Sequence, residues 1–252
     1  MSLTPRAWLV TGCSTGLGRA LAQALISRGE RVFATARNPQ QLSDLVSGHD
    51  NATALKLDVT SAEDIKAVAA AAEKAGGVDV LVNNAGYGYL TAFEEGDEAG
   101  YRAQFETNVF GLAAVTNAFL PQLRASEHPR IVNLSSGTGS LAWSTGPNPQ
   151  FDFLQSGGGG AVYRSSKAAV NALTVLYSLE LADAGIKVNA LAPGRRATNL
   201  VQAFREATPE QLAAAGVGDP GEAATEAVRL ATLPDDGPTG LLFSWDGTVA
   251  PW

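Results

Sequence analysis

Short apolar runs rich in β-branched residues alternate along the chain with longer Ala-rich stretches. In the first such pair, Ala7–Thr11 is apolar up to its final threonine and predicts a strand, whereas Gly16–Gly29 carries apolar residues at helical spacing and predicts a helix. Further strands are predicted at Arg31–Ala36, Ala52–Leu57, Val78–Val82, Arg130–Leu134, Ile186–Leu191 and near Leu241–Ser244. Further helices are predicted at Gln40–Ser47, after a capping Ser61 with Asp64 in the capping-box position, at Glu98–Ser126, at Tyr163–Ala184 and in two stretches before the last strand.

This alternation predicts an α/β fold. Strands that are apolar throughout must be covered on both faces, as in a parallel sheet with helices on each side. Right-handed crossovers then give a doubly wound, Rossmann-like sheet, and we expect residues 1–252 to form one domain. Ligands bind such sheets beyond the carboxyl ends of the strands.

Composition and charge narrow the partners. With 25 acidic and 18 basic residues, a net charge of −7 and no Lys/Arg run, the chain lacks a basic face for nucleic acid. Its longest apolar stretches are interrupted within a dozen residues or so, which argues against a membrane span. The first residues lack a secretory h-region, and Cys13 is the single cysteine, so we expect a reducing, cytoplasmic location. His49 and His128 are the only histidines, and we expect no metal site.

A glycine-rich loop, Thr11–Gly18, joins the first strand to the first helix. Gly12, Gly16 and Gly18 would let the backbone approach a pyrophosphate, whose charge the helix N-terminus favours. The spacing is G-x-x-x-G-x-G rather than the common dinucleotide fingerprint, so the loop alone could be a tight turn.

The same letters also fit G-x-S-x-G, with Ser14 as the nucleophile of an α/β-hydrolase. That fold needs an acid and then a histidine downstream. The only later histidines, His49 and His128, are both far from the chain end, which disfavours this alternative.

The end of the second strand bears on the choice of dinucleotide. NAD-binding sheets usually place an acid there, whereas this chain has none and continues with Arg37. A guanidinium pairs well with phosphate, so the residue favours NADP(H) over NAD(H). The alternative is a solvated surface arginine. Asp58, after the third strand, could lie near the adenine amine or simply cap a helix.

Tyr163 and Lys167 are four residues apart in a predicted helix and would share a face. An adjacent ammonium stabilises a phenolate and lowers the pKa of the phenol, which would make the pair a proton donor for a carbonyl. Y-x-x-x-K on its own is common in surface helices.

Other polar motifs follow further strands. Asn83-Asn84-Ala85-Gly86 follows the fourth strand, Ser135-Ser136 the fifth and Pro193-Gly194 the sixth, with Thr198 shortly after. Asn108 lies inside the long predicted helix. Each could be an ordinary turn, cap or wetted helix position. Together, and in this order, they resemble the short-chain dehydrogenase/reductase family over nearly the whole chain.

The resemblance implies an NADP(H)-dependent oxidoreductase that interconverts a ketone or aldehyde and an alcohol. Tyr163 would be the general acid or base, Lys167 would hold the nicotinamide ribose and lower the tyrosine pKa, and Ser136, preferred over Ser135, would bind the substrate oxygen. Asn108 would hold a relay water. The dinucleotide would be held by Gly12, Ser14, Thr15, Gly16, Leu17, Gly18, Arg37, Asp58, Val59, Asn84, Ala85, Gly86, Tyr163, Lys167, Pro193, Gly194 and Thr198, with Asn84 at the adenosine ribose, Arg37 at the 2′-phosphate and Thr198 at the carboxamide.

The family also assembles through its long helices and last strand, so we expect a homo-oligomer, a dimer or tetramer, acting on a small molecule. A non-catalytic dinucleotide sensor on the same scaffold is the alternative.

The chain departs from the family in two places. Tyr163 lies 27 residues after Ser136, an interval longer than usual by roughly a dozen residues, and we expect a substrate loop around 140–160, where Trp143 and other aromatic residues line the pocket or cover an interface. A lid is expected around 195–217. Arg195 and Arg196 could meet an anionic substrate, the cofactor phosphate or solvent.

Overall fold

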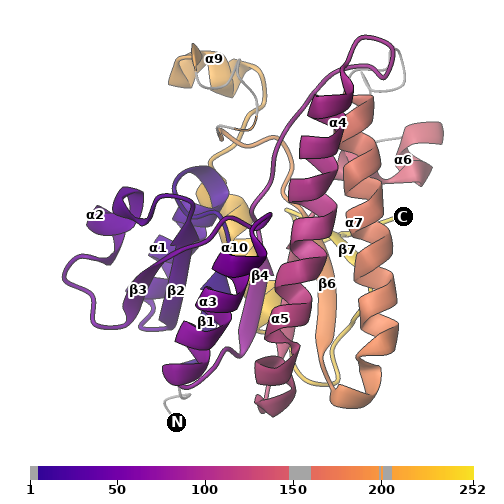
Figure 1. The fold of residues 1–252 in the computed structure, drawn as a ribbon. Coiled ribbons are helices and arrows are strands. Elements are labelled where there is room, and N and C mark those ends of the chain that lie inside the picture. Colours follow the sequence, from indigo (N-terminus) through magenta and orange to yellow (C-terminus); the bar gives the residue numbers. More distant parts are fainter. Residues whose placement is uncertain (1–4, 148–159, 199, 201–205) are drawn as a thin grey trace.

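An eight-stranded sheet in the order β3-β2-β1-β4-β5-β6-β7-β8 forms the centre of the molecule (Figure 1). The computed structural model describes residues 5–147, 160–198, 200 and 206–252. The first seven strands pair in parallel, and β8 runs antiparallel to β7. The strands are β1 (Ala7–Val10), β2 (Arg31–Ala36), β3 (Ala52–Lys56), β4 (Val80–Asn83), β5 (Arg130–Leu134), β6 (Lys187–Ala192), β7 (Leu242–Ser244) and β8 (Val249–Ala250).

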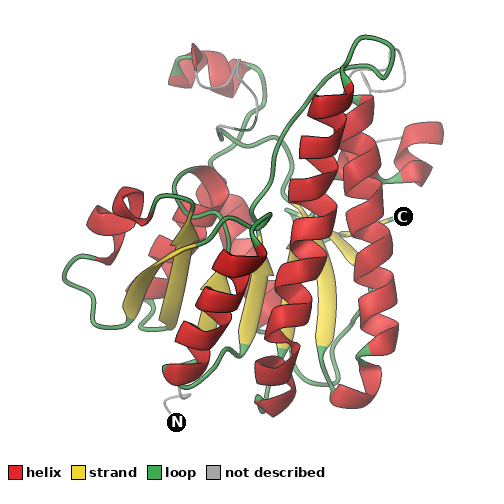
Figure 2. Ribbon diagram, viewed as in Figure 1, coloured by secondary structure: helices red, strands yellow, loops and turns green. Residues whose placement is uncertain are grey.

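The alternation of side chains along each strand fills a hydrophobic layer on each face of the sheet. In β1, Trp8 and Val10 pack into one layer and Ala7 and Leu9 into the other. The first layer is closed by α1 (Gly16–Ser27) and α10 (Pro220–Ala231), and the second by α3 (Ala62–Lys74), α5 (Gly111–Ala125) and α7 (Ala161–Glu180) (Figure 2). The doubly wound arrangement that the sequence predicts is therefore confirmed, with one antiparallel edge strand added.

The long helix predicted at Glu98–Ser126 is divided into three parts. α4 (Glu98–Phe105) passes into a π-helical segment, η2 (Glu106–Phe110), and then into α5. Asn108 is buried inside the π-helical segment. Such segments widen a helix locally and are frequent at functional sites.

The other helices are short or begin close to the first residue predicted for them. Ser61 caps α3 through the backbone N–H of Asp64, as predicted. The Asp64 carboxylate, however, accepts from the backbone of Asp58 and from Lys56 rather than closing a capping box. The remaining elements are η1 (Pro39–Leu42), α2 (Ser43–Val46), η3 (Gly137–Gly139), α6 (Leu141–Thr145), η5 (Ala182–Ala184) and α9 (Pro209–Ala214).

The expected substrate loop and lid are covered in part. Residues 148–159 of the loop and residues 199 and 201–205 of the lid lie outside the described residues. Trp143, at the start of the loop, is 7% exposed and packs against β6, β7 and β8 rather than lining a pocket. Among the described residues, no helix combines the length and apolar character needed to cross a membrane.

Candidate cofactor and active site

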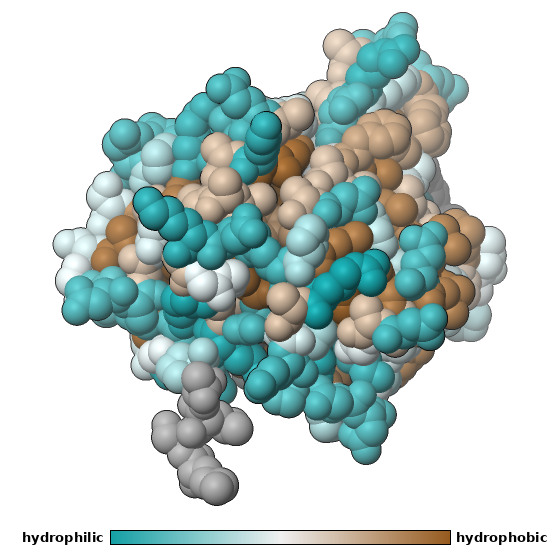
Figure 3. All heavy atoms as spheres, turned by 60° about the horizontal axis from the view of Figure 1, so that its bottom comes forward, coloured by the Kyte–Doolittle hydropathy of each residue, from teal (hydrophilic) through white to brown (hydrophobic). Residues whose placement is uncertain are grey.

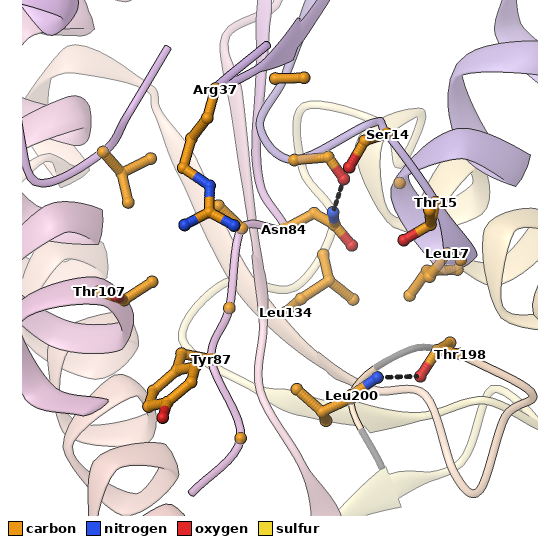
Figure 4. A pocket seen from close by; sticks show the side chains of 18 of the residues that line it. Ser14, Thr15, Leu17, Arg37, Asn84, Tyr87, Thr107, Leu134, Thr198 and Leu200 are labelled. Atoms are coloured by element: carbon orange, nitrogen blue, oxygen red, sulfur yellow. Dashed lines mark hydrogen bonds between the residues drawn. The ribbon is translucent and has the colours of Figure 1, made fainter. Parts of the chain in front are cut away.

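A cavity of about 500 Å³ lies at the carboxyl ends of the parallel strands. Arg37 lies at one end, Asn84 and Leu134 lie in the middle, and Thr198 and Leu200 lie at the other end (Figure 4). The predicted dinucleotide-binding residues that line it are Gly12, Ser14, Thr15, Gly16, Leu17, Gly18, Arg37, Asp58, Val59, Asn84, Ala85, Gly86, Tyr163, Lys167, Pro193 and Thr198. Residues that sequence reasoning missed also line it: Ala36, Leu57, Tyr87, Gly88, Thr107, Leu134 and Leu200. Ser135, ranked after Ser136 in the sequence analysis, lines it too.

Close backbone packing requires glycine in the loop after β1. Gly12 has a φ of +74°, and a Cβ there would lie 2.9 Å from the Cα of Ala85. A Cβ on Gly18 would lie 2.3 Å from Nδ2 of Asn84 and 2.4 Å from the carbonyl oxygen of Gly12. That Nδ2 donates to the carbonyl oxygens of Thr11 (2.8 Å) and Gly12 (3.0 Å), so Asn84 holds the loop in place.

The N-terminus of α1 offers donors to an anion. Its N-cap residue, Thr15, makes no side-chain hydrogen bond to the helix, so the first backbone N–H groups lack a side-chain cap. These N–H groups and the helix dipole favour a phosphate beside the glycine loop. The loop and helix together fit the diphosphate of a dinucleotide.

Two charged residues flank the end of the cavity nearest β2 and β3. Arg37 is exposed, its guanidinium extends over the cavity (Figure 4), and it has no ion pair within the described part of the chain. Asp58 uses Oδ1 to accept from the backbone and hydroxyl of Thr60, and Ser61, not Asp58, caps α3. Both side chains could contact the adenosine half of a dinucleotide.

Tyr163 and Lys167 lie together on α7, and both line the cavity. Nζ of Lys167 lies 5.8 Å from the centre of the Tyr163 ring and donates to the carbonyl oxygen of Leu134 at 2.7 Å. The hydroxyl of Ser136 interacts with the Tyr163 phenol, and it also contacts Oγ1 of Thr138 at 2.9 Å. The structure therefore brings the predicted tyrosine, lysine and serine together.

Burial controls the protonation of this pair. It raises the pKa of Tyr163 to about 12, while the interaction with Ser136 acts in the opposite direction. It lowers the pKa of Lys167 to about 8. The net direction for the phenol pKa is opposite to the one expected from an adjacent ammonium, because desolvation outweighs the lowering by Ser136. A phenol of this kind stays protonated at neutral pH.

Ser135 has a different environment from Ser136. It is 3% exposed, and its hydroxyl donates to Oδ1 of Asn171, with the carbonyl oxygen of Lys167 at 3.3 Å as the alternative acceptor. Either bond fastens the end of β5 to α7. The hydroxyl of Ser136, by contrast, reaches the phenol.

Asn108 supports the loop that follows β4. Its Oδ1 accepts from the backbone N–H of Tyr87 at 2.7 Å, and its Nδ2 donates to the Tyr87 carbonyl oxygen at 3.0 Å and to Oγ of Ser166 at 3.1 Å. A Cβ on Gly86 would lie 3.6 Å from Oδ1 of Asn108 and 3.9 Å from Nζ of Lys167, so both groups border the same space.

Two predicted positions serve packing instead. Gly194 does not line the cavity, and its φ of +72° places it where a Cβ would lie 2.7 Å from the Trp245 ring. Arg196 is 6% exposed, and its guanidinium lies 4.5 Å from the centre of the Trp245 ring and 3.2 Å from Glu222. Arg196 thus faces neither solvent nor the cavity, whereas the expectation from the sequence was contact with a substrate, the cofactor phosphate or solvent.

The structure separates Ser14 from both histidines. His49 and His128 precede β3 and β5, so they lie where those strands begin. Figure 3 brings forward the end of the molecule at which the strands of the sheet begin. Ser14 follows β1 at the opposite edge of the sheet. A strand of four to six residues separates the beginning and the carboxyl end of the sheet by roughly 13–20 Å, which excludes a Ser-His pair and with it the hydrolase alternative. The described residues contain no group of three or more His, Cys, Asp or Glu that could hold a metal.

Comparisons with known proteins show the family of the chain. Residues 6–148 and 153–209 match the family model described as short chain dehydrogenase. The chain is 37% identical over 190 residues to oxidoreductase BOA17 of Botryotinia fuckeliana, covering 74% of this chain and 64% of that protein. It is 34% identical to short-chain dehydrogenase anuI of Penicillium roqueforti, covering 94% of this chain and 96% of that one.

A solved structure extends the likeness to the whole fold. The NADPH-bound carbonyl reductase from chicken fatty liver superposes with a TM-score of 0.84 at 29% identity, covering 99% of this chain and all of that one (100%). The chain therefore belongs to the short-chain dehydrogenase family and is an NAD(P)-dependent oxidoreductase.

Proposed function

We propose that the protein interconverts a ketone or aldehyde and an alcohol, with NADP(H) as its dinucleotide. The observation that carries the proposal is the grouping of the Ser136 hydroxyl, the Tyr163 phenol and the Lys167 ammonium, which lies 5.8 Å from the centre of the phenol ring, beside the cavity bordered by the glycine loop. A bound nicotinamide dinucleotide supplies or accepts the hydride.

In the reductive direction, Tyr163 donates its phenolic proton to the carbonyl oxygen. Its raised pKa of about 12 keeps that proton in place at neutral pH. The Ser136 hydroxyl donates to the same oxygen and stabilises its developing negative charge. In the oxidative direction the phenolate removes the alcohol proton, a step that alkaline conditions favour.

Lys167 and Asn108 complete the proton path. With a pKa of about 8, Lys167 is protonated at pH 7 in a ratio of about ten to one. Its ammonium would bind the ribose hydroxyls of the dinucleotide beside Tyr163 and would help to return a proton to the phenol. Asn108 and Lys167 border the same space next to Gly86, which supports a relay water between them.

The preference for NADP(H) rests on Arg37. Its guanidinium follows β2 at the end of the cavity and has no ion-pair partner in the described regions, and Ser14 and Thr15 also border the cavity. A 2′-phosphate there would gain charge-assisted hydrogen bonds that a 2′-hydroxyl cannot make. The chicken carbonyl reductase, which has the same fold, binds NADPH.

Assembly into a homo-oligomer is part of the proposal. Large apolar side chains are exposed on or beside the long helices: Phe110 (59%), Leu176 (53%) and Leu179 (68%). A second copy would cover such side chains. Sedimentation of the wild type and of a Leu179→Glu variant tests this, with a lower mass expected for the variant.

NADPH oxidation against a panel of ketones and aldehydes tests the reaction. A Tyr163→Phe variant should bind NADPH as the wild type does and lose about a hundredfold to ten-thousandfold in kcat. A variant that turns over normally would remove the proposed acid. A wild type that binds NADPH and reduces no carbonyl would instead identify a dinucleotide sensor.

A further inference from the structure

Gln104 is a wholly buried amide whose hydrogen bonds go to the wall of the cavity. It is 0% exposed and lies on α4, four residues before Asn108. Its Oε1 accepts from the backbone N–H of Tyr89 at 2.6 Å, and its Nε2 donates to the carbonyl oxygen of Tyr87 and to Oγ of Ser166. Gln104 thus holds the same loop as Asn108. It shares the Tyr87 carbonyl oxygen with Asn108 and also binds the backbone N–H of Tyr89, two residues later.

This loop has no regular structure to position it. Residues 84–92 contain neither helix nor strand. The Tyr87 carbonyl oxygen accepts from two buried amides, those of Gln104 and Asn108, and the N–H of Tyr89 donates to Gln104. The path of the loop therefore depends on these side chains.

Ser166 connects the loop to the reacting tyrosine. Its hydroxyl accepts from the amides of Gln104 (3.2 Å) and Asn108 (3.1 Å) and donates to the carbonyl oxygen of Tyr163 at 2.7 Å. The first turns of α7 and the loop after β4 are therefore fixed relative to each other through one buried hydroxyl.

The segment so held presents an apolar surface. Tyr87 and Gly88 line the cavity, and Tyr87 is 41% exposed. The Tyr87 side chain lies at the same end of the cavity as Leu200 (Figure 4). A Cβ on Gly88 would lie 3.0 Å from the Leu200 side chain, so the loop packs closely against it. The charged residues among the described cavity lining are Arg37, Asp58 and Lys167, and the first two lie at the end away from Leu200.

We propose that Gln104 is a positioning residue that sets substrate selectivity, because it fixes Tyr87 as a rigid wall for a carbonyl substrate with a bulky aromatic substituent. The inference rests on the proposed function of the same cavity. If the wall is fixed by Gln104, its loss should weaken binding of a large substrate and leave small substrates, the dinucleotide and the proton transfer unaffected.

The test compares two diketones with the same reacting unit, diacetyl and benzil, in NADPH-dependent reduction by the full-length protein. Gln104→Met keeps the size of the side chain and removes its hydrogen bonds. It should raise the KM for benzil about tenfold, leave the KM for diacetyl within about twofold and keep kcat for both within about threefold. NADPH affinity and the pH profile should not change.

The matched control is Gln122→Met on α5. Gln122 also donates from Nε2 to a backbone carbonyl, that of Ala69 at 2.9 Å, but it does not line the cavity. Equal losses for diacetyl and benzil, or the same benzil effect in Gln122→Met, would overturn the selectivity role. Should Gln104→Met fail to fold, Ser166→Ala removes the acceptor that both amides share and should shift the benzil-to-diacetyl ratio in the same direction.

Amide hydrogen exchange gives a readout that does not need turnover. The Tyr89 amide should exchange faster in Gln104→Met and at the wild-type rate in Gln122→Met. An unchanged Tyr89 rate in Gln104→Met overturns the positioning role alone. A wild type that binds NADPH and reduces neither diketone overturns the proposed function and, with it, the selectivity role.

Discussion

Nζ of Lys167 donates a 2.7 Å hydrogen bond to the carbonyl oxygen of Leu134, the last residue of β5. The bond joins α7 to the carboxyl end of β5, a central strand of the sheet, and Lys167 is only 6% exposed. Within the described residues its ammonium has a neutral acceptor and no carboxylate partner. The desolvation of this charge is therefore poorly compensated, which explains why burial lowers its pKa to about 8.

We predict that Lys167→Met changes how stability depends on pH. Between the folded pKa of about 8 and the unfolded value of 10.5, the unfolded chain binds the proton that the folded chain has released. The free energy of unfolding of the wild type, relative to the variant, should thus rise across this window, by roughly 1–3 kcal/mol. Urea unfolding at several pH values measures it.

The comparison between the two proteins isolates Lys167 from other groups. Burial raises the pKa of Cys13 from 9.0 to about 12, so this thiol lowers stability as pH rises through that range, and it does so in both proteins. A wild-type-minus-variant difference that stays flat from neutral pH to the alkaline end would contradict the buried, uncompensated ammonium.

We predict that the two neighbouring serines separate activity from stability. Ser136→Ala should lower kcat about a hundredfold, because it removes the donor to the reacting oxygen, and change the free energy of unfolding little. Ser135→Ala should cost roughly 1–3 kcal/mol of stability, because Ser135 is buried and its hydroxyl donates to Asn171, with the Lys167 carbonyl as the alternative acceptor. Steady-state kinetics of both variants measure the change in kcat, and urea unfolding measures the change in stability. The opposite assignment of the two effects would exchange the roles of Ser135 and Ser136.

The sheet and the cavity follow from local patterns, which explains why the sequence predicts them. Apolar runs and helical spacing are properties of neighbouring residues, and the polar motifs follow strands whose carboxyl ends meet at one edge. β8 escapes such reasoning, because its two residues form a strand only through pairing with β7.

Features that depend on distant contacts could not be predicted. Asn108 reaches Tyr87, 21 residues earlier, and Gln104 reaches Ser166, 62 residues later. The spacing of Gln104 four residues before Asn108 was the one available signal, since it places both on one helix face. The sign of the Tyr163 pKa shift was missed for the same reason, because burial is a property of the packed structure.

We predict that Arg37 discriminates between the dinucleotides. Arg37→Asp should raise the Kd for NADPH about tenfold to a hundredfold relative to that for NADH, because it replaces the guanidinium by a charge that repels phosphate. Fluorescence titration with both dinucleotides measures the ratio. Arg28→Asp is the matched control, since it changes the net charge equally at the other end of α1, and it should leave the ratio unchanged. An unaltered ratio in Arg37→Asp would remove the argument for a 2′-phosphate contact.

We predict that Gly18→Ala damages the dinucleotide site through Asn84. The added Cβ would lie 2.3 Å from Nδ2 of Asn84 and 2.4 Å from the Gly12 carbonyl oxygen, so the amide that holds the loop must move. NADPH affinity should fall at least about tenfold, measured by titration, while circular dichroism stays native-like.

Gly221→Ala controls for alanine in the first turn of a helix. A Cβ at Gly221 would meet Oδ1 of Asp219, the N-cap residue of α10, at 2.8 Å, and neither residue lines the dinucleotide cavity. This variant should therefore bind NADPH normally. If Gly18→Ala binds NADPH as tightly as Gly221→Ala does, the loop tolerates displacement of Asn84, and close packing against that amide cannot be the reason why position 18 is glycine.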